Sequence, residues 1–218
     1  MKLGVFGGTF NPIHYGHLRA AEEAREMLGL DRVLFIPSGN PPLKSHDLAD
    51  ALQRYKMARL AVVRNRRFEV LDLECAGPGK SYTVNTVEKL LKIYSGAELY
   101  FMLGTDAFLD LPSWWRPDRL VLMVNFVLLF RPGNRFADLV SSPYLDVEKI
   151  SLNRLDKGKL ETVTACLHTG REAVLIRTTP VAISSTDIRR RVKQGLSIKY
   201  LLPEEVESFI ISNKLYQK

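Results

Sequence analysis

Cysteine is scarce in this chain of 218 residues, which contains only two, Cys75 and Cys166. They lie far apart and share no ligand-like spacing with each other or with a histidine cluster. Such a pattern indicates neither a disulfide framework nor a zinc site. We therefore expect both thiols to be reduced and unpaired.

Long apolar runs are also missing. No window approaches the roughly 20 apolar residues that a membrane-spanning helix needs. The first residues, MKLGVFGG, hold one charge and a short apolar run, which is too little for a secretory signal segment. These absences predict a cytoplasmic protein that does not associate with membranes.

The chain has the composition of a globular protein. Hydrophobic residues make up 46% and charged residues 25%, and the length suits one ordinary domain. The formal net charge of +7 favours an anionic partner: nucleic acid, a membrane surface or a phosphorylated small molecule. The basic clusters at residues 64–67 and 189–191 lack the spaced aromatic residues of a base-stacking surface, and we expect the first to be a solvated helix face.

Apolar, strand-like runs alternate with helical patterns along the chain. The runs are KLGVF, RVLFIP, FEVLDLE, ELYFMLG, FVLLF and AVLIRT, and helical patterns cover residues 17–28, 47–64 and 83–94. Strands that are apolar on both faces and alternate with helices are typical of a parallel sheet covered on each side. The sequence therefore predicts an α/β fold, a Rossmann-like doubly wound parallel sheet with helices on both faces.

The whole chain, residues 1–218, is expected to form a single domain. Residues 132–172 are polar and lack clear periodicity, which predicts a variable insertion of short helices and loops. Residues 184–218 are expected to form a helical cap, because Pro203 is followed by acidic residues and then by an apolar helix face.

The stretch FGGTFNPIHYGHL, residues 6–18, links the first predicted strand to the first predicted helix. Open parallel sheets bind ligands beyond the carboxyl ends of their strands. Gly7 and Gly8 permit a sharp turn, and the helix start offers N–H groups and a positive dipole end to an anion. His14 and His17 point the same way from a helix start and can converge on one ligand. Capping, packing, or a metal pair with further ligands are the alternatives.

A second stretch, ISSTDIRRR at residues 183–191, follows the last predicted strand and opens another helix. Ser184 or Ser185 suits an N-cap and Asp187 suits the first turn, so helix initiation explains half of the pattern. The hydroxyls and backbone donors at this helix start, with Arg189 a turn further in, predict a second anion site.

These two stretches carry a resemblance to a known superfamily. GGTFNPIHYGHL resembles the GxFxPxHxGH signature of the nucleotidyltransferases, and ISSTDIR resembles their ISSTxIR motif. Within that superfamily the chain resembles, nearly end to end, the bacterial nicotinate mononucleotide adenylyltransferases. The resemblance implies the nucleotidyltransferase fold and transfer of AMP from ATP to nicotinate mononucleotide. The products would be nicotinate adenine dinucleotide and pyrophosphate, in a step of NAD biosynthesis.

Further segments carry the same resemblance. IPSGNPPLK resembles a loop ending in PPHK, with Leu43 in place of the usual histidine, and SYTVNTV resembles the SYTxxT segment. LGTDAFLDLPSWW resembles GxDxxxxxPxW, in which Trp114 would stack on the nicotinate ring, although each tryptophan is as readily a core residue. Asn11 stands where many members have aspartate.

The resemblance implies a set of site residues. Those for ATP are Gly7, Gly8, Thr9, Phe10, His14, His17, Gly104, Asp106, Ser184, Ser185, Thr186 and Arg189. Those for the mononucleotide are Lys44, Tyr82, Thr83, Thr86, Asp106, Trp114, Trp115 and Arg131. His14, His17 and Arg189 would be catalytic. Mg2+ would bind through the phosphates of ATP, without dedicated protein ligands.

The implied chemistry needs no general base. A phosphate monoester has a second pKa of about 6, so its oxygen is already an anionic nucleophile at neutral pH. Histidine has a reference pKa of about 6.5, which neighbouring phosphates raise, so His14 and His17 are expected to donate hydrogen bonds as cations. We expect His17 at the α-phosphate and His14 at the β- or γ-phosphate.

Other functions remain open from sequence alone. The acceptor could be nicotinamide mononucleotide or phosphopantetheine. A transfer-RNA-binding module related to class I aminoacyl-tRNA synthetases is the rival from another class, but no KMSKS-type loop is present, so no nucleic-acid partner is expected. The sequence also leaves open whether the chain forms a homo-oligomer.

Overall fold

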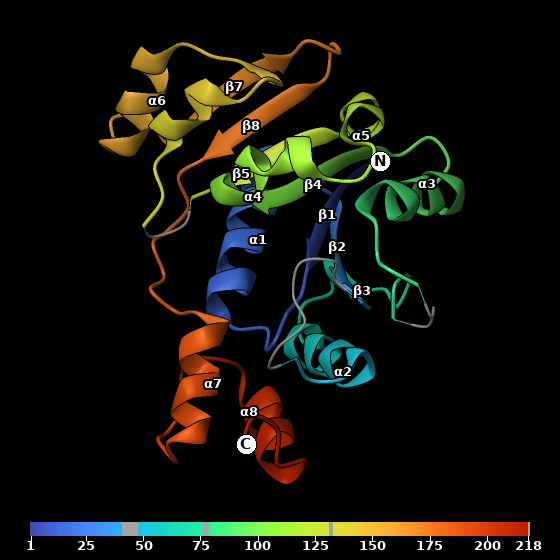
Figure 1. The fold of residues 1–218 in the computed structure, drawn as a ribbon, viewed down its shortest axis with the longest axis vertical. Coiled ribbons are helices and arrows are strands. Elements are labelled where there is room, and N and C mark those ends of the chain that lie inside the picture. The colour runs from blue at the N-terminus through green and yellow to red at the C-terminus, as the bar shows by residue number, and fades with distance from the viewer. Residues whose placement is uncertain (41–47, 76–78, 131–132, 218) are drawn as a thin grey trace.

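An eight-stranded sheet forms the centre of the protein, in a computed structural model that describes residues 1–40, 48–75, 79–130 and 133–217 (Figure 1). Its strand order is β3-β2-β1-β4-β5-β8-β7-β6. In that order the bounds are Phe68–Val70, Arg32–Pro37, Lys2–Gly8, Glu98–Gly104, Asn125–Leu129, Glu172–Ile176, Thr162–Leu167 and Leu145–Asp146. All pairs from β3 to β8 are parallel. The α/β, doubly wound prediction is confirmed.

The strand order reverses beside β1. The chain runs outward from β1 to β2 and β3, and then returns to the other side of β1 with β4 and β5. Because these strands are parallel, Gly8, Pro37 and Gly104 end β1, β2 and β4 at one edge of the sheet. Such a reversal leaves a crevice beyond the strand ends, where open sheets bind ligands.

Helices cover both faces of the sheet. One face carries α1 (Tyr15–Leu28), α2 (Ala51–Val62), α7 (Ser185–Lys193) and α8 (Glu204–Ser212). The other carries α3 (Thr83–Ile93), α4 (Thr105–Leu109), η1 (Leu111–Ser113), α5 (Pro117–Met123), η2 (Phe136–Ser141) and α6 (Lys149–Asp156). Figure 1 shows α7 and α8 at the end of the molecule away from α6.

Strand β2 shows why both faces fill with helices. Val33 and Phe35 join the cluster under α1 and α2, while Leu34 and Ile36 join the opposite cluster. All four side chains are almost completely buried. A strand without a polar side can satisfy both of its faces only under two layers of helices.

The segment at residues 132–172 differs from its prediction of helices and loops. It contains η2 and α6, but also β6 and β7, and β7 pairs antiparallel with both β6 and β8. The sheet is therefore mixed at this edge. Val163, Ala165 and Leu167 alternate along β7 and contribute to the core, a period of two that the polar residues between them conceal.

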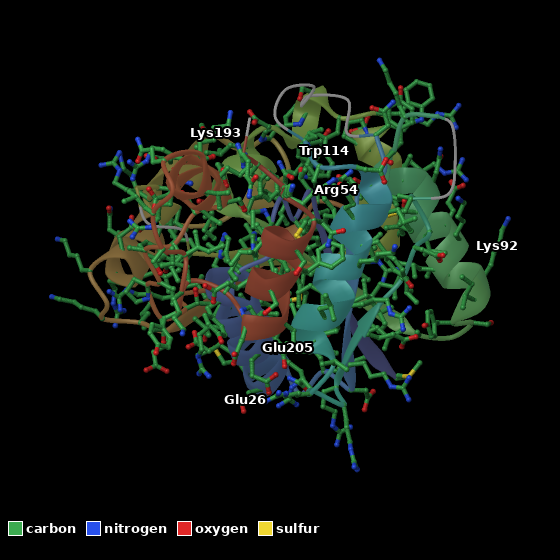
Figure 2. The ribbon with its side chains drawn as sticks, turned by 90° about the horizontal axis from the view of Figure 1, so that it is seen from below. Glu26, Arg54, Lys92, Trp114, Lys193 and Glu205 are labelled. Atoms are coloured by element: carbon green, nitrogen blue, oxygen red, sulfur yellow. The ribbon has the colours of Figure 1, made fainter. Side chains whose placement is uncertain are left out.

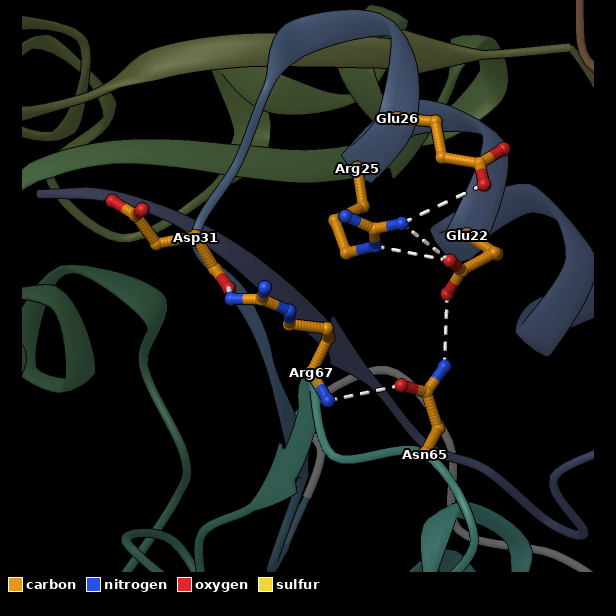
Figure 3. A network of polar contacts seen from close by, with 6 residues as sticks. All are labelled: Glu22, Arg25, Glu26, Asp31, Asn65 and Arg67. Atoms are coloured by element: carbon orange, nitrogen blue, oxygen red, sulfur yellow. Dashed lines mark hydrogen bonds and ion pairs between the residues drawn. The ribbon is translucent and has the colours of Figure 1, made fainter.

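The basic cluster at residues 64–67 was expected to be a solvated helix face, but it is not part of a helix. It lies between α2 and β3, where Asn65 accepts a hydrogen bond from the Arg67 amide at 2.9 Å and donates to Glu22 of α1 at 2.9 Å (Figure 3). Arg25 bonds the other oxygen of Glu22 at 2.7 Å. Part of this cluster therefore ties the turn after α2 to α1.

Two absences predicted from the sequence can be compared with the structure. Cys75 and Cys166 are both free. Within the described ranges, no helix has the length and apolar character required to cross a membrane.

Candidate active site

The loop that follows β1 has a constrained backbone. Phe10 adopts φ 46°, in the left-handed region, although its side chain is bulky and 2% exposed. Such a conformation costs on the order of 1 kcal/mol and persists only where packing imposes it. The ring meets Phe6 and His17 edge-on, at centroid distances of 5.7 and 5.2 Å. Packing therefore holds the loop in the shape that leads to the histidines.

The two histidines converge at the start of α1, as predicted. His14 is the N-cap residue, and its ring centroid lies 3.8 Å from that of His17. The backbone N–H of His14 donates to Nδ1 of His17 at 3.3 Å, and the His17 amide donates back to the His14 carbonyl at 3.0 Å. The two histidines therefore cap the start of α1 and also lie close together.

This contact bears on the charge of His17. A ring nitrogen that accepts a hydrogen bond carries no proton, so in this conformation Nε2 carries the ring proton. The expected imidazolium would have to give up the bond from the His14 amide. In this conformation Nε2 is the ring nitrogen that can donate to a ligand.

Gly16 allows this arrangement. A Cβ at this position would lie 3.0 Å from both Cε1 and Nδ1 of His14, which is tighter than nine in ten real Cβ contacts. A larger residue would therefore require the His14 ring to shift by a few tenths of an ångström. The HxGH spacing was the sequence signal for this role, although Gly16 was not among the predicted site residues.

The second motif begins α7 and is bonded to the first. Ser184 is the N-cap, and its Oγ accepts from the Asp187 amide at 3.1 Å, as the capping interpretation predicts. Ser185 Oγ donates to the Pro12 carbonyl at 2.8 Å, and Arg189 Nη1 donates to the Asn11 carbonyl at 2.9 Å. The starts of α1 and α7, where the two anion sites were predicted, are therefore joined by hydrogen bonds.

The residues after β4 lie at the same edge of the sheet as the first motif. Gly104 ends the strand and is the N-cap of α4, and Asp106 lies in the first turn of that helix. Thr105 between them is 2% exposed. Among the residues that the structure describes, no hydrogen-bond partner is present for its Oγ1, for Ser38 Oγ after β2 or for Nε of Arg189, although all three atoms are buried. Buried polar atoms of this kind mark a place where a ligand can supply partners.

Three of the residues predicted to surround the mononucleotide lie at the start of α3. Tyr82 is its N-cap and Thr83 its first residue. Thr86 is 5% exposed and donates from Oγ1 to Glu74 Oε1 at 2.6 Å, so its hydroxyl is engaged inside the protein. Burial raises the pKa of Glu74, although hydrogen bonds from Thr86 and Ser81 oppose this effect.

The two tryptophans have different surroundings. Trp114 is half-buried against the core, edge-on to Phe101 at 6.4 Å. Trp115 is 49% exposed, lies 5.5 Å from the ring of Tyr82, and has the Arg116 guanidinium 4.9 Å above it. Trp115 and Tyr82 thus present the more accessible aromatic surface. Lys44 and Arg131 lie outside the described residues.

Two residues behind the first motif were not predicted from the sequence. Arg54 on α2 is 1% exposed and donates from Nη1 to the Thr9 carbonyl at 2.8 Å. Tyr216, near the carboxyl end of the chain, donates to Asn11 Oδ1 at 2.7 Å, and burial raises its pKa. Arg54 lies three and four residues before Met57 and Ala58, so its position on the buried face of α2 could have been predicted from this helical spacing.

Known proteins resemble the chain over its full length. The cytidylyltransferase-like family model matches residues 5–191. A relative from Pelobacter propionicus is 41% identical, over 100% of this chain and 99% of its own. Another from a Thermoanaerobacter species is 41% identical, over 100% and 95%. Each is named as a probable nicotinate-nucleotide adenylyltransferase.

A solved structure shows the same fold at low identity. Nicotinic acid mononucleotide adenylyltransferase of Plasmodium falciparum, complexed with NaAD, aligns with a TM-score of 0.73 at 18% identity, covering 99% of this chain and 97% of that one. The family model and the two full-length relatives at 41% identity show that the chain belongs to the cytidylyltransferase-like family and, within it, to the nicotinate-nucleotide adenylyltransferases.

Proposed function

We propose that this protein transfers the AMP group of ATP to nicotinate mononucleotide, forming nicotinate adenine dinucleotide and pyrophosphate. The proposal rests on the hydrogen bonds that join the two motifs at the sheet edge where β1 and β4 end. Ser185 and Arg189 bond the backbone of residues 11 and 12, directly before the histidine pair. A triphosphate could therefore contact both helix starts at once.

In the proposed reaction, a phosphate oxygen of the mononucleotide attacks the α-phosphorus of ATP. A new P–O bond forms there as the bond to the bridging oxygen of the β-phosphate breaks, and pyrophosphate leaves with that electron pair. Positioning two anions and stabilising the charge on the leaving group is the whole task of the protein. We assign the α-phosphate to His17, through Nε2–H, and the outer phosphates to His14, Thr186 and Arg189.

The glycine loop and the residues after β4 complete the proposed ATP site. Gly7, Gly8, Thr9 and Phe10 would lie under the phosphates, and Gly104 and Asp106 would contact a ribose. For the mononucleotide we propose the aromatic surface of Tyr82 and Trp115, with Thr83 beside it. Trp114 would act chiefly as the packed support of that surface.

Nucleotidyltransferases of this family typically use a divalent metal ion together with ATP. We propose Mg2+, which prefers phosphate oxygens and water as ligands. Within the part of the chain that the structure describes, no group of three or more His, Cys, Asp or Glu side chains could hold a metal. In the proposal the ion arrives with ATP and would neutralise phosphate charge there.

The proposal is tested by incubating the purified protein with ATP, Mg2+ and one candidate acceptor at a time. We expect nicotinate adenine dinucleotide and pyrophosphate in equal amounts with nicotinate mononucleotide, and neither product after EDTA treatment. Pyrophosphate release that requires phosphopantetheine or transfer RNA instead would reject the proposal.

A further inference from the structure

The guanidinium of Arg54 is the most deeply buried charge among the described residues. It donates three hydrogen bonds, all to backbone carbonyls: Thr9 at 2.8 Å, Gly39 at 2.8 Å and Ala49 at 3.0 Å. Figure 2 shows Arg54 on α2, beside α8. Burial lowers the pKa of Arg54. Three aligned carbonyl dipoles partly offset the cost of burying its charge.

The three carbonyls belong to segments with different proposed ligands. Thr9 lies in the loop after β1 that would hold ATP phosphates. Gly39 follows β2 and Ala49 precedes α2, so in sequence they flank the segment that contains Lys44. One guanidinium thus bonds the loop proposed for ATP, the chain directly after β2 and the chain directly before α2.

Gly39 extends this connection to α3. Its amide donates to Ser81 Oγ at 3.1 Å, directly before Tyr82 and Thr83. A Cβ on Gly39 would lie 1.9 Å from the Glu74 carbonyl oxygen, so no side chain fits. A continuous path of hydrogen bonds therefore links Thr9 through Arg54 and Gly39 to Ser81.

We propose that Arg54 is a positioning residue that fixes the ATP side of the site relative to the mononucleotide side. The inference rests on the proposed function, because in-line transfer requires both substrates in one geometry. A displacement of about 1 Å between reacting groups can cost about 100-fold in rate. The planar fork of arginine fixes the directions of several acceptors at once, whereas the ammonium of lysine acts as a point charge.

The test compares Arg54→Lys with Arg59→Lys, a control on the exposed side of the same helix. We expect Arg54→Lys to lower kcat by about 100-fold, while the KM values change less than about threefold. We also expect the affinity for mononucleotide to stop responding to a non-hydrolysable ATP analogue, although each ligand still binds alone. Arg59→Lys should match the wild type in every measurement.

Thermal unfolding of each variant separates positioning from loss of fold. If Arg54→Lys does not fold, the proposal is tested with Ser81→Ala, which removes the hydrogen bond between Gly39 and Ser81 at the other end of the path. We then expect a lower kcat with a wild-type melting temperature, and unchanged kcat would overturn the proposal. A folded Arg54→Lys with unchanged kcat, or with binding of both ligands lost in parallel with stability, would also overturn it. An inactive wild type would instead reject the proposed function.

Discussion

The backbone N–H of His14 limits how His17 can act. Because this N–H donates to Nδ1, the ring presents Nε2 as its remaining donor. His17 lies in the first turn of α1, where an anion would also meet the positive end of the helix dipole. A single fixed hydrogen-bond donor is sufficient for our mechanism, since the attacking phosphate is already ionised.

His17→Ala should therefore remove stabilisation that matters mainly in the transition state. We expect kcat to fall by at least about 100-fold, as for other lost donors to a developing charge, with little change in either KM. Steady-state kinetics with both substrates varied measure this directly. The matched control is His168→Ala, an exposed histidine outside the site. Wild-type turnover in His17→Ala would refute the assignment.

The exposed ring of Trp115 gives a prediction about binding. Removing an aromatic stacking partner costs about 0.5–1.5 kcal/mol beyond lost area, so Trp115→Ala should raise the KM for the mononucleotide several-fold and leave that for ATP unchanged. Trp114→Ala, in contrast to Trp115→Ala, should lower the melting temperature, because Trp114 packs against the core. Equal losses for both substrates in Trp115→Ala would show that it does not face the acceptor.

Helix α1 is tied to the connection between β8 and α7 by a buried carboxylate. Glu23 is 8% exposed and accepts from the Thr179 amide at 2.7 Å and from the Thr179 hydroxyl at 2.6 Å. Arg19 bonds the same group at 2.6 Å. This contact fixes the chain before Ser184 and Ser185, so it helps to set where α7 begins relative to the histidines.

Stability should depend on pH through this carboxylate. Burial alone would raise the pKa of Glu23, but the bonds from Thr179 and Arg19 outweigh burial and lower it below the reference value of 4.5. A carboxyl with a lowered folded-state pKa stabilises the fold above its unfolded pKa, and this contribution is lost as pH falls through the folded value.

Glu23→Gln should therefore lower the free energy of unfolding by about 1–3 kcal/mol at pH 7. Urea denaturation at pH 7 and at successively lower pH should show the gap to wild type closing below the reference pKa. Glu26→Gln, on the exposed side of α1 with 57% of its side chain accessible, is the control. A gap that stays constant with pH would contradict the charge argument.

The central elements could be predicted from sequence because their patterns are unambiguous. In β2, Val33 and Phe35 contact one cluster while Leu34 and Ile36 contact the other, which requires helices on both faces. Strand β7 was missed because its exposed residues resemble a loop and its pairing depends on β8. Local sequence does not reveal such an edge pairing.

Within the candidate site, the motif residues could be predicted but their supports could not. Arginine usually occupies the solvated face of a helix, and the partners of Arg54 are carbonyls of residues 9, 39 and 49, which carry no side-chain signal. The left-handed conformation of Phe10 likewise arises from packing among Phe6, Phe35 and His17. These features depend on the assembled fold.

At the scale of the whole molecule, residues near the carboxyl end of the chain contact the first motif. Tyr15 at the start of α1 donates to the Leu201 carbonyl at 3.2 Å, and the Tyr216 hydroxyl bonds Asn11 at 2.7 Å. Residues near both ends of the chain therefore hold one loop, and α7 and α8 support it from the side of α2 (Figure 1). These contacts hold the loop after β1, which we propose to face the phosphates of ATP.

We propose that this assembly joins AMP to nicotinate mononucleotide. The most direct measurement is the kcat/KM for nicotinate mononucleotide and for nicotinamide mononucleotide, with saturating ATP and Mg2+, following both dinucleotide products by chromatography. We predict nicotinate adenine dinucleotide and pyrophosphate in a one-to-one ratio, with the higher kcat/KM for nicotinate mononucleotide. A higher value for nicotinamide mononucleotide, or no dinucleotide with either acceptor, would contradict the account.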